Sequence, residues 1–164
     1  MIRRSPRSDV RATLKQAITR ARFAGSETVE AERILLALSG NRGTVAHAVL
    51  SEAGLDDERI SAALAVEQAV SLAAVGVTAL TTPTPNYLPD SQEVGESARL
   101  AITRGAAAER ARKDRRIRST HLLIGVLSAD VGWVPRALAH VGVDRGRLFA
   151  ECHTALDNVL RHAS

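Results

Sequence analysis

Apolar residues recur at intervals of three and four along most of this 164-residue chain, the spacing that gathers them on one face of an α-helix. The first such run follows Ser8, a residue type that caps helix N-termini, and continues to about Ala24, where Gly25 interrupts it. We therefore predict a first helix over residues 8–24. Its apolar face consists of Val10, Leu14, Ala17, Ile18 and Ala21.

Three more helices are predicted in the first half of the chain. The second begins near Glu30, where acidic residues suit the positive end of the helix dipole, and ends at about residues 39–40. The third covers residues 44–53 and stops at Gly54, and Asp56 caps the fourth. The side chains expected to face inward from the third and fourth helices are Val45, Val49, Leu50, Ile60, Leu64 and Val70.

The helical pattern lapses in the middle of the chain. Residues 76–89 are rich in Thr, Pro and Asn, and their prolines exclude a regular helix. Helical spacing restarts at residue 90 or 91, with apolar positions at Val94, Ala98, Leu100, Ala101 and Ile102. Four helices are predicted in this second half, at residues 90–113, 119–127, 134–141 and 144–161.

The second half also repeats the first at a shift of 88 residues. Arg33 corresponds to His121 (121 − 33 = 88) and Gly54 to Gly142, and the shift holds without a gap over residues 29–56. Such internal repeats decide the architecture of a chain, because each unit needs its neighbour to bury its apolar face.

We therefore predict an all-α fold in which two tandem four-helix repeats pack as one pseudo-symmetric eight-helix domain over residues 1–164. Repeat one covers about residues 8–75, the linker about 76–89 and repeat two about 90–162. A four-helix unit of this size can bury little core by itself, so the repeats should pack against each other, and a groove between them is the natural binding place.

Composition supports helices and gives a weak hint about partners. Aromatic residues make up only 2% of the chain, and the apolar set is mainly Ala, Leu, Val and Ile. The net charge of +4 permits an acidic partner, although both signs of charge are scattered along the sequence. Cys152 is the single cysteine, and no apolar stretch is long enough to span a bilayer, so we expect a cytoplasmic protein.

No pattern of residues indicates catalysis. The histidines do not form a metal-binding motif with Cys152, and no serine or aspartate sits in a nucleophile motif. We therefore expect no enzyme activity, no cofactor and no metal.

The motif Val-x-x-Glu-x-Ile-Leu-Leu-Ala-Leu, followed by a glycine-containing turn and by Val-Ala-x-x-Val-Leu-x-x-Ala-Gly-Leu-Asp, recurs in altered form in repeat two. This ordered pair resembles the double repeat of the Clp N-terminal domain, which receives substrates and adaptors in Clp unfoldases. The resemblance covers about residues 8–70 and 90–160. Because the chain lacks the Gly-x-x-x-x-Gly-Lys-[Ser/Thr] phosphate loop of an ATPase, the resemblance implies a stand-alone module for proteins or peptides of the Clp system. Such a module would serve as an accessory protein, an adaptor or a decoy.

The resemblance also implies candidate ligand-binding residues. In ClpC-type members, a Glu in helix two of each repeat receives the guanidinium of phosphoarginine, and a Thr at the start of helix one assists. Glu32 occupies the Glu position in repeat one, Thr120 occupies it in repeat two, and Arg7 or Ser8 stands at the Thr position. At most one such site is predicted, because Thr120 cannot form the charge-assisted pair. The structural alternative for Glu32 is a favourable interaction with the dipole of its own helix, and His121 is expected to be a packed or capping residue.

Two further surfaces are candidates for partner binding. By position in the family, the hydrophobic residues before each first helix line a peptide surface, which suggests Ile2 and either Tyr87 or Leu88 unless these residues simply form a turn. A basic run contains Arg110, Arg112, Lys113, Arg115, Arg116 and Arg118. This run is either a solvated loop or a site for phosphates or an acidic partner.

Other functions remain open. One alternative is a small helical regulator that uses the basic run to bind nucleic acid, although the few scattered aromatic residues do not form a stacking platform. Another is a structural partner that docks onto a Clp ring and modulates its assembly without binding clients.

Overall fold

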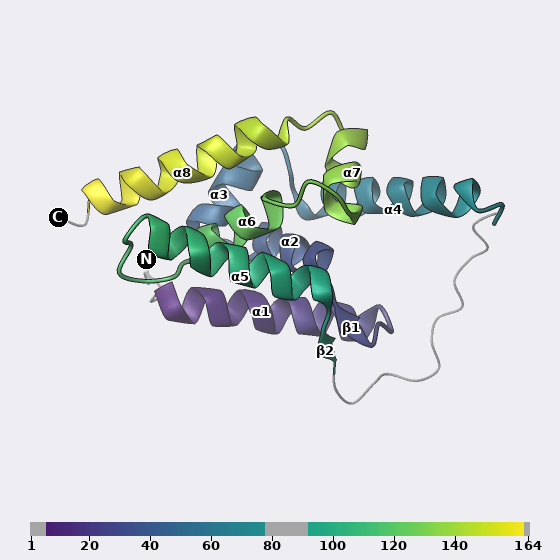
Figure 1. Cartoon of the computed structure of the whole chain (residues 1–164), viewed down its shortest axis with the longest axis horizontal. Coiled ribbons are helices and arrows are strands. Elements are labelled where there is room, and N and C mark those ends of the chain that lie inside the picture. The colour runs from purple at the N-terminus through teal and green to yellow at the C-terminus, as the bar shows by residue number, and fades with distance from the viewer. Residues whose placement is uncertain (1–5, 78–91, 163–164) are drawn as a thin grey trace.

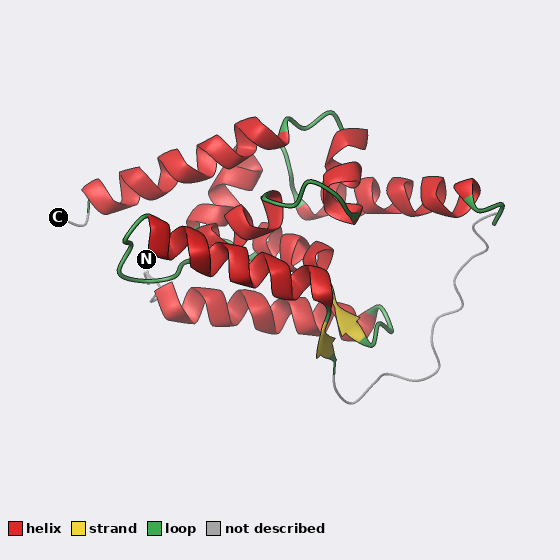
Figure 2. Ribbon diagram, viewed as in Figure 1, coloured by secondary structure: helices red, strands yellow, loops and turns green. Residues whose placement is uncertain are grey.

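The computed structural model describes the backbone of residues 6–77 and 92–162, and the side chains from residue 8 onward. These residues form eight helices and one pair of very short strands (Figure 2). In chain order the elements are α1 (Pro6–Phe23), β1 (Thr28–Val29), α2 (Ala31–Gly40), α3 (Val45–Glu52), α4 (Asp57–Ala74), β2 (Glu93–Val94), α5 (Glu96–Ala111), α6 (Ser119–Leu127), α7 (Trp133–His140) and α8 (Arg145–Arg161). The predicted all-α fold is confirmed.

The 88-residue shift carries the helices of one repeat onto those of the other. The first residues of α6, α7 and α8 follow those of α2, α3 and α4 by 88 positions each (119 − 31, 133 − 45 and 145 − 57). In Figure 1, α4 and α8 extend from the centre of the molecule in opposite directions, as equivalent helices of two repeats do when a pseudo-twofold axis relates them. The eight-helix pseudo-symmetric arrangement is therefore present.

The core lies around α2 and α6, the most completely buried helix of each repeat. Every residue of α6 is buried, and so is all of α2 except Arg33 and Gly40. The repeats interlock around this centre, because α1 contacts α6 and α5 contacts α2, while α3 packs on α8 and α4 on α7. Neither repeat therefore completes its core alone.

Glycine allows α5 and α6 to approach each other backbone to backbone. A Cβ atom on Gly125 would lie 1.9 Å from the carbonyl oxygen of Ala101, and one on Gly105 would lie 2.6 Å from that of His121. No larger residue fits at either position without moving a helix.

The first turns of the central helices are capped across the repeat boundary. Ser97 at the start of α5 accepts a hydrogen bond from the Ala31 backbone N–H of α2 at 2.8 Å. Asp9 at the start of α1 accepts one from the Ser119 N–H of α6 at 3.2 Å. The two contacts are equivalent under the repeat (97 − 9 = 88 and 119 − 31 = 88), and each satisfies a helix N–H that lacks an intrahelical partner.

Some predicted boundaries and inward-facing residues were wrong. Helix α1 begins two residues before Ser8, at Pro6, since proline is well suited to a first helical turn. Helix α5 begins at Glu96 rather than at residue 90 or 91, because residues 93–94 form β2 and pair in parallel with β1. A two-residue strand is too short to leave a periodic signal.

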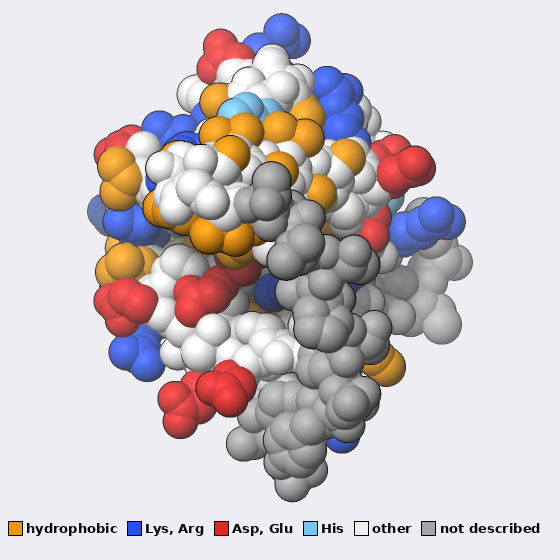
Figure 3. Space-filling model, turned by 90° about the vertical axis from the view of Figure 1, so that its right-hand side faces the viewer, with side chains coloured by type: hydrophobic (Ala, Val, Ile, Leu, Met, Phe, Trp, Pro, Cys, Tyr) orange, Lys and Arg blue, Asp and Glu red, His pale blue; other side chains and the backbone are white. Residues whose placement is uncertain are grey.

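Four apolar residues that helical spacing marked as core positions are exposed: Ile18, Val70, Val94 and Leu100. Val70 is 49% exposed because it lies on the outer half of α4, which projects from the body of the molecule. Figure 3 views the molecule from this end and shows hydrophobic side chains gathered on the surface.

Among the described residues, no helix is both long enough and apolar enough to cross a membrane. The candidate surface residues Ile2, Tyr87 and Leu88 lie outside the described residues, as does most of the linker.

Candidate functional site

Glu32 lies in the first turn of α2 and is only 8% exposed. Burial raises the pKa of its carboxyl group, and this effect is opposed by its own backbone N–H and by the neighbouring Arg33. None of the ion pairs among the described residues includes Glu32. The structure therefore holds a nearly buried carboxylate without a cationic partner.

A groove of about 330 Å³ opens beside Glu32, between the start of α2, one face of α5 and the loop that joins α6 to α7. We call it the Glu32 groove. Its walls are mainly apolar, and Arg104 of α5 also reaches it. Its lining includes Glu32, Leu100, Arg104, Val126, Val131 and Trp133.

The α6–α7 loop forms the outer wall of this groove and is held from α8. The guanidinium of Arg145 donates to the carbonyl oxygens of Leu127 at 2.9 Å and of Ala129, and it pairs with Asp130 at 3.0 Å. Gly132 has a φ of 118°, a conformation that essentially only glycine adopts. Together these features fix the entry into α7 and place Trp133 at its first position.

Trp133 was not predicted as a site residue. It is the only tryptophan of the chain, it is 38% exposed, and it lines the groove together with Glu32. The only signal in the sequence was that one tryptophan stands out in a chain with few aromatic residues. Its spacing did not link it to Glu32.

The equivalent place in repeat two is closed. Thr120 stands 88 positions after Glu32 and is completely buried, so a ligand cannot contact it in this conformation. Asn41 donates hydrogen bonds to Asp9 at 3.2 Å and to Thr13 at 2.9 Å, and all three residues are buried. Three buried side-chain oxygens at this closed place have no partner among the described residues: Gln16 Oε1, Ser119 Oγ and Thr120 Oγ1.

The remaining residues of the predicted ligand site are not gathered around Glu32. Ser8 is exposed in α1, and no residue of α1 lines the Glu32 groove. The side chain of Arg7 lies outside the described residues.

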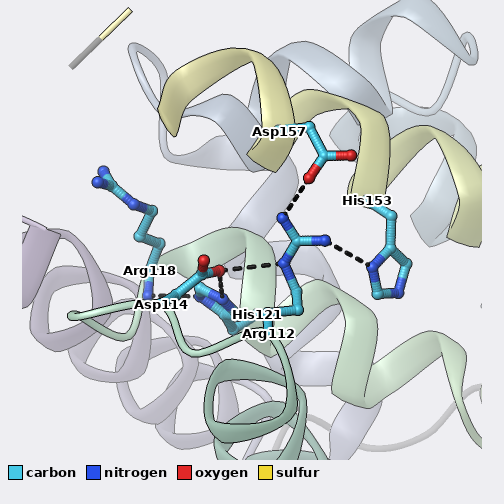
Figure 4. Close-up of polar contacts among 6 residues, drawn as sticks. All are labelled: Arg112, Asp114, Arg118, His121, His153 and Asp157. Carbon is cyan, nitrogen blue, oxygen red and sulfur yellow. Dashed lines mark hydrogen bonds and ion pairs between the residues drawn. The ribbon is translucent and has the colours of Figure 1, made fainter. Parts of the chain in front are cut away.

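The basic run falls at the turn between α5 and α6, and one of its members is not available as a free cation. Arg112 is half-buried and donates to Asp157 of α8 at 2.6 Å, to Asp114 at 3.1 Å and to His153 at 3.2 Å (Figure 4). Arg112 therefore already has carboxylate partners within the protein. The four residues Arg110, Lys113, Arg115 and Arg116 are exposed, and Arg118 is half-buried.

Hydrogen bonds of the buried residues His121 and Asp114 fix the conformation of this turn. His121 is fully buried, and its Nδ1 accepts a hydrogen bond from the Arg118 backbone N–H at 3.0 Å, so Nε2 carries the proton that it shares with Asp114 at 2.8 Å. Burial lowers the pKa of His121, partly against the effect of Asp114. His121 thus caps α6, as expected, and the side chain of Arg118 points away from the cluster in Figure 4.

A second ionic cluster joins α4 to α7. Glu67 pairs with Arg136 at 2.5 Å and with His140 at 2.8 Å, and it accepts a hydrogen bond from Ser71 at 2.8 Å. The hydrogen bond from Ser71 and the contact with Arg136 lower the pKa of Glu67 to about 2. The cluster connects the two repeats, since α4 belongs to repeat one and α7 to repeat two. Because Glu67 already has these three partners, it is not available to pair with a ligand.

Neither a metal site nor a reactive thiol is present among the described residues. They contain no group of three or more His, Cys, Asp or Glu side chains that could hold a metal ion. Cys152 is fully buried, and burial raises its pKa to about 12, so its thiol is not a nucleophile near neutral pH.

Neither a family model nor a curated protein matches the sequence. Several solved structures nevertheless share the fold. The Hsp104 N-terminal domain from Candida albicans has a TM-score of 0.64 at 12% identity, over 88% of this chain and 86% of that chain. The N-terminal domain of the caseinolytic protease associated chaperone ClpD from Arabidopsis thaliana has a TM-score of 0.63 at 15% identity, over 94% and 95%.

A third structure, from a study of a malarial protein secretion system, has a TM-score of 0.57 at 18% identity over 87% of this chain and 88% of that chain. The chain therefore has the fold of the Clp and Hsp104 N-terminal domains, which confirms the resemblance at the level of the fold.

Proposed function

We propose that this protein is a non-catalytic module that binds segments of other proteins, and that its ligand site is the Glu32 groove. The observation that carries the proposal is the nearly buried Glu32 carboxylate without a cationic partner. An unpaired buried charge is costly, and its desolvation is offset when a ligand supplies a cation. The apolar walls of the groove then bind the rest of the ligand.

A guanidinium fits this site better than an ammonium. Its planar fork can donate two hydrogen bonds to one carboxylate, and its face can lie against the indole of Trp133. Arg104 lines the same groove and forms no ion pair within the described residues. It is therefore placed to take a negative group attached to the guanidinium, as in phosphoarginine.

The shared fold supports a role beside Clp-type machines. The protein would act as an accessory, an adaptor or a decoy in the cytoplasm, and it would receive proteins or peptides that a ClpC-type unfoldase also receives. The fold is common to N-terminal domains of chaperones, one of which is described as associated with a caseinolytic protease. It is the groove, rather than the fold, that specifies the proposed ligand.

Calorimetric titration tests the proposal directly. Wild-type protein is titrated with phosphoarginine, with free arginine and with an arginine-containing peptide, and the same ligands are added to Glu32→Gln. We expect the substitution to weaken binding at least about tenfold, because Gln cannot form the charge-assisted pair.

The matched control for this titration is Glu58→Gln. Glu58 also lies in the first turn of a helix, but it is exposed and does not line the Glu32 groove. It takes part in none of the ion pairs among the described residues. The control should bind like the wild type. Absence of heat with all three ligands, or equal binding by Glu32→Gln, would refute the proposed site.

The second candidate function is binding to a nucleic acid through the exposed basic turn between α5 and α6. The supporting observation is that Asp114 and His121 fix the turn while Arg110, Lys113, Arg115 and Arg116 remain exposed. This function predicts that log K falls with log salt by roughly 0.7 to 0.9 per phosphate contact. A salt-insensitive or undetectable interaction with a single-stranded oligonucleotide would exclude it.

A further inference from the structure

A second, smaller groove meets the Glu32 groove at a common wall. It has a volume of about 180 Å³ and lies between α2 and α4. We call it the side groove. Glu32 and Trp133 line both grooves, so a ligand that contacts these two side chains reaches the two spaces at once.

The two grooves differ in character on either side of this wall. The side groove is bordered by Leu36 and Leu64, which pack in or against the core, and by the exposed Ala65. The polar side chains of Arg33, Ser61 and Gln68 also line it. Its volume is about half that of the Glu32 groove, which suits one aliphatic side chain rather than a helix. The charge without a partner is at the wall itself, on Glu32.

We propose that the two grooves form one track for an extended peptide, in which an arginine side chain lies at Glu32 and Trp133 and a nearby aliphatic side chain fills the side groove. This inference rests on the proposed function and names the ligand class of the same site. The occupant must bring a cation to the unpaired carboxylate and apolar surface to both sides of it. An extended peptide does so, because its side chains emerge at short, regular intervals.

A second copy of the chain is a poorer occupant. It would have to present an arginine from a convex surface into a space this small, and the arginine would need to project beyond its neighbours. A free small ligand such as arginine satisfies Glu32 but leaves the side groove empty. The dependence of affinity on the aliphatic residue therefore separates a peptide track from an isolated cation pocket.

The single tryptophan makes the experiment specific. Because Trp133 is the only indole of the protein and lines both grooves, its emission reports occupation of the track without a label. The probe is the blocked heptapeptide Ser-Leu-Gly-Arg-Gly-Leu-Ser. It is compared with one version in which citrulline, a neutral isostere, replaces arginine, and with another in which serine replaces both leucines.

We expect the parent peptide to change the emission of Trp133 saturably. Each altered peptide should bind at least about tenfold more weakly, because one loses the charge pair and the other loses the apolar contact. Parent and leucine-free peptides of equal affinity would overturn the track.

Two variants on α4 give a matched test of the side groove. Ala65→Glu fills it with a bulky charged side chain, whereas Ala73→Glu makes the same change at an exposed position on the same helix that lines neither groove. Both changes introduce a good helix former, so both variants should fold. We expect Ala65→Glu to weaken the parent peptide at least about tenfold and Ala73→Glu to bind it normally.

The outcomes distinguish the inference from the function on which it rests. If the parent peptide binds in a way that needs Glu32 but ignores Ala65→Glu, the track is wrong and the proposed function stands. If no arginine peptide binds although phosphoarginine does, the track is also wrong and the proposed function stands. If neither binds, the proposed function fails and the inference fails with it. A wild-type dimer in sedimentation that Ala65→Glu dissociates would assign the side groove to a second copy and overturn the peptide track.

Discussion

At Glu32 and Thr120 the two repeats place equivalent helix positions in different surroundings. Glu32 borders an open groove and lacks an ion pair, whereas Thr120 is completely buried. The backbone cannot account for this difference, since α2 and α6 begin 88 residues apart and receive equivalent caps from Ser97 and Asp9. The difference arises in the side chains around each position.

Asn41 and Ala129 occupy equivalent positions (129 − 41 = 88) in the loops that follow α2 and α6. The amide of Asn41 donates to Asp9 and Thr13, and Asp9 in turn accepts from the backbone N–H of Ser119, the residue before Thr120. Ala129 has no group that can bridge to α5, and Arg145 holds its loop from the α8 side. A duplicated fold can thus keep an open groove in one repeat while the equivalent position in the other becomes part of the core.

The largest effect is expected from replacing Gly125 by Ala. A Cβ at this position meets backbone atoms of α5, which cannot rotate away as a side chain can, so α5 and α6 must separate. We expect a loss of about 3 kcal/mol in the free energy of unfolding, the upper end of the usual cost of overpacking. Urea unfolding followed by circular dichroism measures it.

The equivalent position in repeat one is Ala37, which is fully buried and already accommodates a Cβ. Its replacement by Gly should cost only about 1 kcal/mol through helix propensity and lost packing. Similar losses for Gly125→Ala and Ala37→Gly would contradict the closer approach of α5 to α6.

A smaller effect is expected from opening the closed site. Asn41→Ala removes two buried hydrogen bonds and leaves Asp9 and Thr13 without this partner, which should cost about 2 kcal/mol of unfolding free energy. The same urea experiment measures the loss. A neutral Asn41→Ala would mean that Asn41 is not what holds the second site closed.

The reverse exchange tests the open site. Ala129→Asn adds a side chain to the wall of the Glu32 groove and should lower the affinity for arginine ligands severalfold, with little change in stability. Calorimetry on this variant supplies the measurement. Full affinity in Ala129→Asn would show that the groove does not require the small residue.

Acid should weaken the contact between α4 and α7. The ion cluster at this contact has no equivalent in the other repeat. Glu67 corresponds to Ala155 (155 − 67 = 88), so the ion cluster occurs on one side only. The folded pKa of Glu67, about 2, lies below the ordinary glutamate pKa of 4.5. Its contribution is therefore present above pH 4.5 and is lost as the pH falls toward 2.

The measurement for Glu67 is the urea midpoint as a function of pH. The wild type should lose stability relative to Glu67→Gln between pH 4.5 and pH 2, because the variant has no carboxylate to protonate. Parallel pH profiles for the two proteins would show that the cluster does not contribute to stability.

Much of the fold follows from sequence, and the site follows only in part. Most of the helices have apolar residues at helical spacing, a glycine follows the ends of α1, α3, α4 and α7, and the repeat predicts how the helices pair. Glu32 was found because a motif marks it. By contrast, Asn41 acts through partners 28 and 32 residues away in α1, and no local pattern reveals such hydrogen bonds. Trp133 reaches Glu32 only because Gly132 and Arg145 fix the loop before it.

The smallest effect is expected at His121, whose counterpart in repeat one is Arg33. Burial lowers the pKa of His121 from 6.5, so the folded state favours the neutral ring, while Asp114 partly opposes the shift. The unfolded chain binds a proton first as the pH falls through 6.5, and stability decreases until the folded ring is also protonated.

This loss of stability begins at a higher pH than the loss from Glu67, so the two contributions separate along one pH profile. His121→Gln should reduce the decrease just below pH 6.5, to which His153 also contributes because burial and Arg112 lower its pKa, and leave the one below pH 4.5 intact. Because Gln also changes the cap of α6, the shape of the profile is the diagnostic quantity, rather than the absolute stability. A wild-type profile that is flat between pH 6.5 and pH 4.5 would mean that charging His121 costs the folded protein nothing.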